Sequence, residues 1–375
     1  MVIYLDANAT QPLRPAARDA MYRAWEIAGN PYSVHAAGRA ARRVMEDARE
    51  TIAACHGTAA RNLVFTSGGT EADALAIHAL GTGRRLLISA VEHDAVRAAR
   101  PDAITLPVDP GGRLDIAALE ARLADNIPSL VCLMLANNET GVIQPVADAA
   151  AICRCRHALL HVDAVQAAGR IPVRLPELGA HSLAISSHKL GGPAGIGALL
   201  LAEDAPFASA LIAGGGQERG RRGGTPSVAL AAGFAAAATE AGADDPGRVA
   251  ALRDAAEAAV VNAGAIVCGD RDHRLPNTTC LALPGVAAST QVMALDLDGI
   301  AVSAGAACSS GKVQASHVLK AMGLDTLAGS AIRVSLPWNV TEADIEGFVH
   351  TYARLANRLC PQTAGHRVGL VTTEA

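Results

Sequence analysis

Short apolar runs alternate along the chain with longer stretches in which alanine and leucine recur at helical spacing. Six of these runs are expected to form strands, at residues 62–68, 85–93, 129–141, 159–166, 182–189 and 196–203. Helices are expected between several of them, at residues 70–80, 115–124 and 146–157. Strands that alternate with helices usually pack as a mostly parallel sheet covered by helices on both faces. The pattern therefore predicts an α/β fold.

Polar side chains gather at the positions where the predicted strands end. They are Thr70, His93, Asn138, Glu139, Asp163, Gln166, Ser186, His188 and Lys189. In an open parallel sheet, ligands bind beyond the carboxyl ends of the strands, because the connecting loops meet there. We therefore expect these side chains to converge on one crevice.

The regular alternation of strand and helix stops near residue 245. Beyond it the sequence predicts a mixed set of elements: a helix over residues 247–262, strands near 277–284 and 331–338, and a final helix from Thr341. This change indicates a second, smaller α+β domain. We predict a large cofactor-binding domain over residues 16–245. The small domain is predicted to combine residues 1–15 with residues 246–375.

Composition and charge narrow the class of protein. The chain has 375 residues, of which 50% are hydrophobic and 18% charged, enough for a sizeable globular core. Its net charge is −4 and its basic residues form no long run, so the electrostatic footprint of a nucleic-acid-binding protein is missing. No segment reaches the roughly 20 apolar residues of a membrane span, and the first residues do not resemble a secretory signal. We expect a cytoplasmic protein that binds neither nucleic acid nor membrane.

The eight cysteines are scattered through the chain, unlike those of a small disulfide scaffold. Cys153 and Cys155 could form half of a metal site, but no second pair follows at zinc-ribbon spacing. We interpret them as two thiols on a helix and expect no metal. Cys308 lies in SAGAACSSG, without the bulky apolar neighbours of a typical buried cysteine. This stretch alone leaves open a small cysteine in a tight turn or a reactive thiol on a loop.

The most specific pattern is a lysine preceded, 26 residues earlier, by an aspartate at the end of a neighbouring strand. Lys189 follows an apolar strand and precedes a glycine-rich turn, a place where burial lowers the pKa of an amine and makes it nucleophilic. Such a lysine can form a Schiff base with an aldehyde. Asp163 is placed to pair with a pyridinium nitrogen, which keeps such a ring an electron sink. Together the two residues indicate pyridoxal 5'-phosphate.

The segment SGGTEADAL supplies the donors that a phosphate group needs. Its glycines, including Gly69, let backbone N–H groups approach an anion, Thr70 adds a hydroxyl, and a helix begins there with its positive end. Ser186 and His188, which flank the lysine, could add further contacts. A Gly-Gly-Thr turn also begins many ordinary helices, so this segment alone does not indicate a phosphate site. The presence of Lys189 in the same sequence strengthens that interpretation.

Ten segments, in this order, resemble those of cysteine desulfurases. They read YLDANAT, GNPYSVHAAGR, FTSGGTEADALAI, VEHDAV, NNETGVIQP, HVDAVQAAG, SSHKLGGPAGIGAL, GGGQERGRRGGTPSV, SAGAACSSG and AIRVSL. The similarity is to the IscS and NifS group of the class V aminotransferase-like enzymes, and it extends to about residue 358. It implies a pyridoxal-phosphate-dependent transferase of fold type I that forms a homodimer. Gln11 and Gly223 depart from the pattern, since relatives usually have threonine at the first position and serine or alanine at the second.

The resemblance implies cofactor-binding roles for the matching residues. Lys189 is similar to the lysine that forms the Schiff base, Asp163 to the partner of the pyridine nitrogen, and Gln166 to the donor for the ring phenolate oxygen. His93 resembles the histidine that stacks on the ring and moves protons. The implied phosphate site consists of Gly69, Thr70, Ser186 and His188, with Thr225 added by the other subunit.

The resemblance also implies the reaction. Asn138, which also borders the cofactor, and Arg333 match the groups that hold the substrate carboxylate, and Cys308 matches the sulfur acceptor. L-cysteine would become L-alanine, leaving a persulfide on Cys308 for an acceptor protein such as an Fe–S scaffold. Two alternatives stay open at this point. The same cofactor serves selenocysteine lyases and aminotransferases, and the chain could instead be an idle scaffold for an assembly partner.

Overall fold

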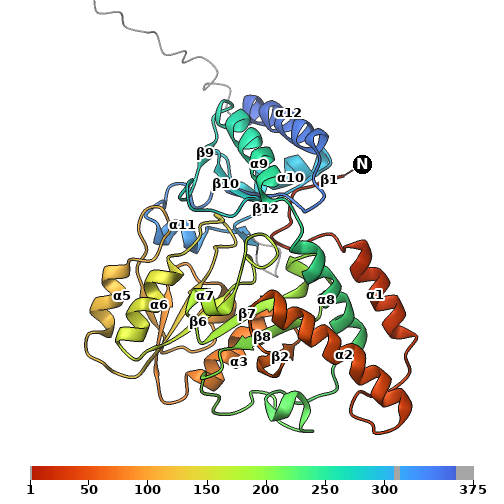
Figure 1. Ribbon diagram of the computed structural model, residues 1–375. Helices are drawn as coiled ribbons and strands as arrows, with labels where there is room; N and C mark the ends of the chain where they lie inside the picture. The colour runs from red at the N-terminus through yellow and green to blue at the C-terminus, as the bar shows by residue number, and fades with distance from the viewer. Residues whose placement is uncertain (1, 308–312, 360–375) are drawn as a thin grey trace, which may run out of the picture.

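Seven strands form the central sheet of the computed structural model, which describes residues 2–307 and 313–359 (Figure 1). The strands are β2 (Leu63–Thr66), β3 (Arg85–Ser89), β4 (Ile104–Leu106), β5 (Ser129–Met134), β6 (Leu159–Asp163), β7 (Ser182–Ser186) and β8 (Gly197–Leu201). Their order across the sheet is β2-β8-β7-β6-β5-β3-β4. β3 to β7 pair in parallel, whereas β8 is antiparallel to β2 and β7. The predicted α/β fold with a mostly parallel sheet is confirmed.

The central strands are buried on both faces, as their continuous apolar runs require. Every residue of β5, β6, β7 and β8 is buried. Alternate side chains of β3 enter opposite cores: Leu86 and Ile88 pack into one hydrophobic cluster and Leu87 into the other. β4 was not predicted, because a three-residue strand with one exposed position carries almost no periodic signal.

Helices cover the two faces of this sheet. They are α1 (Pro15–Trp25), α2 (Ala36–Cys55), α3 (Gly69–Leu80), α4 (Asp94–Arg97), α5 (Ile116–Leu123), α6 (Val146–Cys155), α7 (Leu175–Leu178) and α8 (Val228–Ala241). Leu75 and Leu80 of α3 pack on one face of the sheet. Residues of α2, α5, α6 and α8, such as Met45 and Phe234, pack on the other. The predicted helices at 70–80, 115–124 and 146–157 correspond to α3, α5 and α6.

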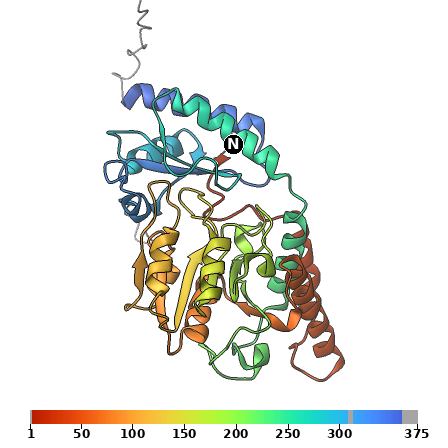
Figure 2. The same cartoon turned by 60° about the vertical axis from the view of Figure 1, so that its left-hand side comes forward.

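A second unit is built on a four-stranded antiparallel sheet with the order β12-β15-β10-β9. Its strands are β9 (Ile266–Val267), β10 (Thr278–Ala282), β12 (Ser303–Ala304) and β15 (Ala331–Ser335). Its helices are α9 (Pro246–Val261), α10 (Ala288–Leu297), α11 (His317–Ala321) and α12 (Glu342–Leu359). α9 and α12 lie on the side of this unit that faces away from the central sheet (Figures 1 and 2). In the described part of the chain, no helix is long and apolar enough to cross a membrane.

The N-terminal residues belong to this second unit. β1 (Ile3–Tyr4) pairs in parallel with β11 (Ile300–Ala301). β13 (Ala306–Ala307) pairs antiparallel with β14 (Val313–Gln314). Residues 308–312, between these two strands, are not described. On this grouping we propose the division predicted above, with residues 16–245 as one domain and residues 1–15 with 246–375 as the other.

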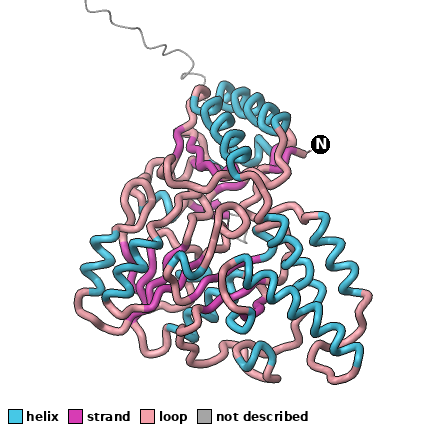
Figure 3. The backbone as a smooth tube through the Cα atoms, viewed as in Figure 1, coloured by secondary structure: helices cyan, strands magenta, loops and turns pink. Residues whose placement is uncertain are grey.

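The segment after β1 runs between the two units. The N–H of Leu5 donates to the carbonyl of Ala301 at 2.8 Å, and the N–H of Gln11 donates to the carbonyl of His188 at 2.9 Å. Loops occupy the region between the central strands and the second unit, which is at the top of Figure 3. The first residues of the chain thus connect the second unit to the carboxyl ends of the central strands, where the candidate site lies.

Candidate active site

A cavity of about 170 Å³ opens at the carboxyl ends of the central strands. It is lined by Gly69, Thr70, Asp73, His93, Met134, Ala136, Asn138, Asp163, Val165, Gln166, Ser186, His188 and Lys189. The structure therefore brings together most of the side chains that the strand-end pattern singled out. Glu139, which the pattern also included, is buried outside this lining and accepts a hydrogen bond from Ser316 Oγ at 2.5 Å.

Lys189 ends a short 3₁₀ turn, Ser187–Lys189, that follows β7 directly. Its Nζ donates hydrogen bonds to the carbonyl oxygens of Asn8 and Ala9, the second at 3.0 Å. Both acceptors belong to the N-terminal segment that joins the two units. The amine is therefore held in the cavity by neutral backbone groups.

The electrostatic surroundings of Lys189 favour the neutral amine. Burial lowers the pKa of Lys189 to about 7, and the nearby positive charges of Arg333 and Arg170 act in the same direction. Asp6 and Asp163 oppose this shift with weaker effects. A substantial share of the amine is thus unprotonated near neutral pH, the state in which a lysine is nucleophilic.

Asp163 is the last residue of β6, and its Oδ1 accepts a hydrogen bond from the N–H of Val165 at 2.8 Å. Burial, followed by the neighbouring Asp73, raises the pKa of Asp163 to about 7. A carboxylate in such a place is costly until a cation pairs with it. The site is therefore suited to a protonated ring nitrogen.

A buried polar pair lies beside Asp163. His161 Nε2 is 3.1 Å from Asp73 Oδ1, and His161 Nδ1 is 2.8 Å from Ser182 Oγ. Burial lowers the pKa of His161 to about 4 and raises that of Asp73 well above its usual range. Asp73 also lines the cavity, yet the sequence analysis did not include it, because an aspartate in the first turns of a helix ordinarily needs no further explanation.

The N-terminus of α3 forms the other end of the cavity. A Cβ on Gly69 would lie 2.6 Å from Val165 Cγ2, so only glycine allows the backbone to approach so closely here. The free N–H groups of the first turn and the exposed Thr70 face an open space. Burial, followed by Lys189, lowers the pKa of His188 to about 4, so this side chain offers a neutral imidazole. Together these groups fit a phosphate group.

His93 caps the N-terminus of α4 and borders the same cavity. Its Nδ1 accepts a hydrogen bond from the N–H of Ala95 at 3.1 Å. Because Nδ1 is the acceptor, the neutral ring carries its hydrogen on Nε2. His93 can therefore hold or donate a proton at Nε2.

Arg333, on β15, reaches this region from the second unit. Its Nη1 donates to the carbonyl of Asn138 at 3.1 Å and its Nη2 to Asp6 Oδ1 at 2.7 Å. Its Nε is buried and has no hydrogen-bond partner among the described residues. A guanidinium whose fork is fixed next to Asn138, which lines the cavity, is suited to a substrate carboxylate.

Two of the predicted site residues that the structure describes, Arg333 and Thr225, are not among the residues that line the cavity. Thr225 is exposed. That Thr225 acts in the site of another subunit stays a prediction. Cys308 lies outside the described residues.

The two departures from the family pattern have local structural reasons. A Cβ on Gly223 would lie 2.4 Å from the carbonyl oxygen of Gly214, so the observed turn excludes serine and alanine. Gln11 is buried, and its Oε1 accepts a hydrogen bond from the N–H of Trp338 at 3.2 Å. Gln11 thus adds a contact between the N-terminal segment and the second unit.

Two further residues next to the cavity, Asn8 and Arg170, were not predicted from the sequence. The carbonyl of Asn8 accepts hydrogen bonds from both Lys189 and Gln166, and its Nδ2 donates to the carbonyl of Asn138 at 3.1 Å. Arg170 donates hydrogen bonds to the backbone carbonyl and the side-chain Oε1 of Gln166. The only available signals were the position of Asn8 in the motif DANAT and the four-residue spacing of Gln166 and Arg170.

Comparisons with known proteins agree with this geometry. The pattern of the family described as Aminotransferase class-V matches residues 3–348. A protein named cysteine desulfurase from Cereibacter sphaeroides is 42% identical over 374 residues, which cover 95% of this chain and 96% of the relative. An IscS-like cysteine desulfurase from Mycobacterium tuberculosis is 37% identical over 371 residues, which cover 92% and 93%.

Solved structures with the same arrangement of elements include a NifS-like protein and a protein described as SspA in complex with cysteine. The NifS-like protein has a TM-score of 0.89 and 33% identity, covering 96% of this chain and 100% of its own. The SspA structure has a TM-score of 0.77 and 27% identity, covering 89% and 98%. The similarity therefore spans both units and includes the residues that line the cavity.

Proposed function

The chain belongs to the aminotransferase class-V family and to its cysteine desulfurases, and we propose that its cavity binds pyridoxal 5'-phosphate and converts L-cysteine to L-alanine. The observation that carries this proposal is the placement of Lys189 and Asp163 in one cavity with the glycine start of α3. These three features supply an amine for the aldehyde, a partner for the ring nitrogen and donors for the phosphate.

Each of the four functional groups of the cofactor has its own residues in this proposal. Lys189 Nζ would hold the aldehyde carbon, Asp163 would pair with the ring nitrogen, and Gln166 would donate to the phenolate oxygen. The phosphate is held by Gly69, Thr70, Ser186 and His188, with Thr225 from the second subunit of a homodimer. When bound, pyridoxal phosphate withdraws electrons from the Cα atom of the attached amino acid.

The other residues bind the substrate and move its protons. Arg333 and Asn138 hold the carboxylate and thereby fix the orientation of Cα. Lys189 Nζ takes the Cα proton, a role that fits an amine with a pKa of about 7. His93 lines the cavity, and with Nδ1 bound to the N–H of Ala95 it would donate a proton to the substrate from Nε2.

Sulfur leaves the site on Cys308. In the balanced reaction, L-cysteine and the Cys308 thiol give L-alanine and a Cys308 persulfide: the C–S bond of the substrate breaks and an S–S bond forms. The role of Cys308 rests on the sequence resemblance, since the residue lies outside the described part of the chain. The persulfide then passes to an acceptor protein, such as a scaffold for Fe–S cluster assembly.

Alanine formation from L-cysteine tests this function. The purified protein is loaded with pyridoxal phosphate and supplied with L-cysteine and a thiol reductant, and alanine and sulfide are measured over time. We expect equal amounts of the two products from the wild type and neither from Lys189→Ala. A wild-type protein that binds the cofactor but forms no alanine would refute the proposal.

A further inference from the structure

The side-chain amide of Gln166 is held between a donor and an acceptor. Its Oε1 accepts a hydrogen bond from Arg170 Nη1 at 2.5 Å, and its Nε2 donates to the carbonyl of Asn8 at 3.0 Å. A guanidinium group has only donors, so it cannot accept a hydrogen bond from the amide nitrogen. Arg170 therefore excludes the flipped amide and directs the oxygen of Gln166 away from the cavity.

Arg170 is an unusual cation for a protein interior. It is only 8% exposed, and its other hydrogen bonds run from Nη1 to the carbonyl of Gln166 at 2.8 Å and from Nη2 to the carbonyl of Ala7 at 3.0 Å. Its Nε has no partner within the described residues. These acceptors are neutral oxygens. A buried charge without a carboxylate partner is costly, so the position is not explained by stability alone.

We propose that Arg170 is a positioning residue for the cofactor: it fixes the amide of Gln166 so that Nε2 presents a hydrogen to the phenolate oxygen of pyridoxal phosphate. This inference rests on the proposed function, because it needs that cofactor in the cavity. The second hydrogen of Nε2 is the one used, since the first is donated to Asn8. The positive charge next to Oε1 also polarises the amide and strengthens this donor.

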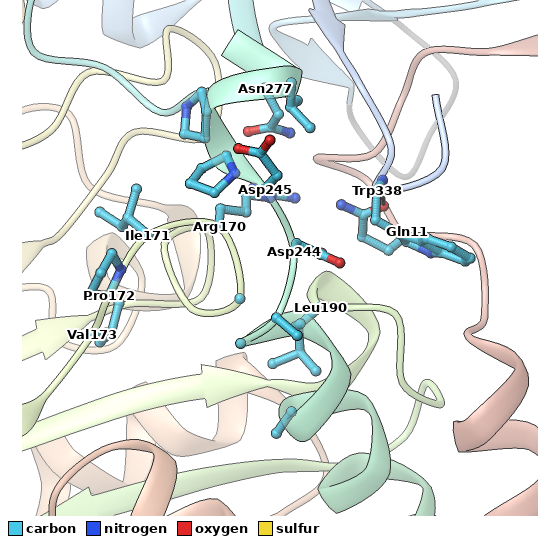
Figure 4. A pocket seen from close by; sticks show the side chains of 18 of the residues that line it. Gln11, Arg170, Ile171, Pro172, Val173, Leu190, Asp244, Asp245, Asn277 and Trp338 are labelled. Atoms are coloured by element: carbon cyan, nitrogen blue, oxygen red, sulfur yellow. Dashed lines mark hydrogen bonds between the residues drawn. The ribbon is translucent and has the colours of Figure 1, made fainter. Parts of the chain in front are cut away.

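Arg170 also borders a second cavity. This cavity, of about 600 Å³, lies at the junction of the two units and is lined by Arg170, Leu190, Asp244 and Trp338 among others (Figure 4). Gln166 lines the smaller cavity and Arg170 the larger one. Truncation of Arg170 therefore leaves a space next to Gln166 that a small cation can reach through the larger cavity.

The charge of Arg170 also acts on Lys189. The charged groups around this amine are Arg333 and Arg170, which lower its pKa, and Asp6 and Asp163, which raise it. Loss of Arg170 removes one of the two positive neighbours. The pKa of Lys189 should then rise, an effect that can be measured without the cofactor.

The test compares Arg170→Ala and Arg170→Lys with the wild type and with Arg14→Ala as a matched control. Arg14 is also a buried arginine at this junction, but its partners are Leu190 and Asp244 rather than Gln166. The first readout is the dissociation constant of pyridoxal phosphate. The second is the pH dependence of Lys189 acetylation in the cofactor-free protein, measured by mass spectrometry.

For Arg170→Ala we expect cofactor affinity to fall by about 10- to 100-fold, the range for a lost hydrogen bond to a charged group. The acetylation profile of Lys189 should shift to higher pH. Guanidinium chloride at non-denaturing concentration should restore part of the affinity. Arg170→Lys, which keeps the charge without the planar fork, should fall between the wild type and Arg170→Ala. Arg14→Ala should change neither readout.

Wild-type affinity and an unshifted acetylation profile in Arg170→Ala would overturn the inference and leave the proposed function intact. Failure of the wild type itself to bind pyridoxal phosphate would instead refute the proposed function. If Arg170→Ala does not fold, Gln166→Glu provides an independent test. This substitution keeps an oxygen toward Arg170 but removes the donor, so we expect a folded protein with about 10-fold weaker cofactor binding. Unchanged binding in Gln166→Glu would overturn the inference.

Discussion

The amine of Lys189 donates a hydrogen bond to the carbonyl oxygen of Ala9 at 3.0 Å. This contact joins the end of a central strand to the N-terminal segment, which pairs with the second unit through β1. The amine of the proposed catalytic lysine is thus aligned by a backbone that depends on both units. A cofactor aldehyde must replace this contact, and the neutral carbonyl releases the amine at little cost.

Cofactor attachment should depend on pH in a defined direction. Burial, Arg333 and Arg170 lower the pKa of Lys189 to about 7, so the reactive neutral amine increases as the pH rises through that value. Below pH 7 we expect the rate of attachment to the cofactor-free protein to fall about tenfold per pH unit. Stopped-flow absorbance of the bound cofactor measures this rate. A rate that keeps rising tenfold per unit well above pH 8 would show that the amine is not perturbed.

Asp163→Asn should separate cofactor binding from turnover. The amide keeps the size of the side chain but cannot stabilise a protonated ring nitrogen. We expect kcat to fall by about 100-fold, which corresponds to roughly 3 kcal/mol for a lost charge-assisted hydrogen bond. Because burial raises the pKa of Asp163, its carboxylate is costly without a cofactor. The cofactor-free variant should therefore unfold at the same or a higher temperature than the wild type, and a clearly lower one would contradict this account.

Arg333→Lys should weaken recognition of the substrate carboxylate. A lysine keeps the positive charge but loses the fork that also contacts Asn138 and Asp6. We expect KM for L-cysteine to rise by about 10- to 100-fold, with a smaller effect on kcat. Cysteamine, which lacks the carboxylate, should bind to the wild type and the variant equally weakly. An unchanged KM would remove Arg333 from the substrate site.

Gly69→Ala should disturb the phosphate end of the cavity. The new Cβ would lie 2.6 Å from Val165 Cγ2, so the Val165 side chain or the first turn of α3 must shift. We expect pyridoxal phosphate to bind about tenfold more weakly, as one lost phosphate contact would predict. Gly329→Ala is a matched control, because no heavy atom lies within 4 Å of its Cβ position and its backbone is outside the left-handed region. Equal affinities in the two variants would argue against a phosphate at this turn.

Much of the site was predictable because buried parallel strands leave a simple pattern in the sequence. Strands buried on both faces appear as continuous apolar runs, and the polar residue that ends each run, such as Asp163 or Lys189, lies at one edge of the sheet. Asn8 and Arg170 carry no such signal, because neither residue ends a strand. Asn8 lies in an irregular segment, and Arg170 contacts Gln166. Their contacts depend on how the N-terminal segment passes between the two units, and that path is set by tertiary packing.

The fate of the substrate sulfur tests the central claim most directly. Wild type and Cys308→Ala, both loaded with pyridoxal phosphate, are given L-cysteine without a reductant, and alanine and protein-bound persulfide are measured together. We predict that the wild type forms alanine and persulfide in equal amounts during the first turnover. Cys308→Ala should keep its yellow cofactor and form neither. Alanine formation by Cys308→Ala at the wild-type rate, or a cofactor-loaded wild type that forms neither product, would contradict the account.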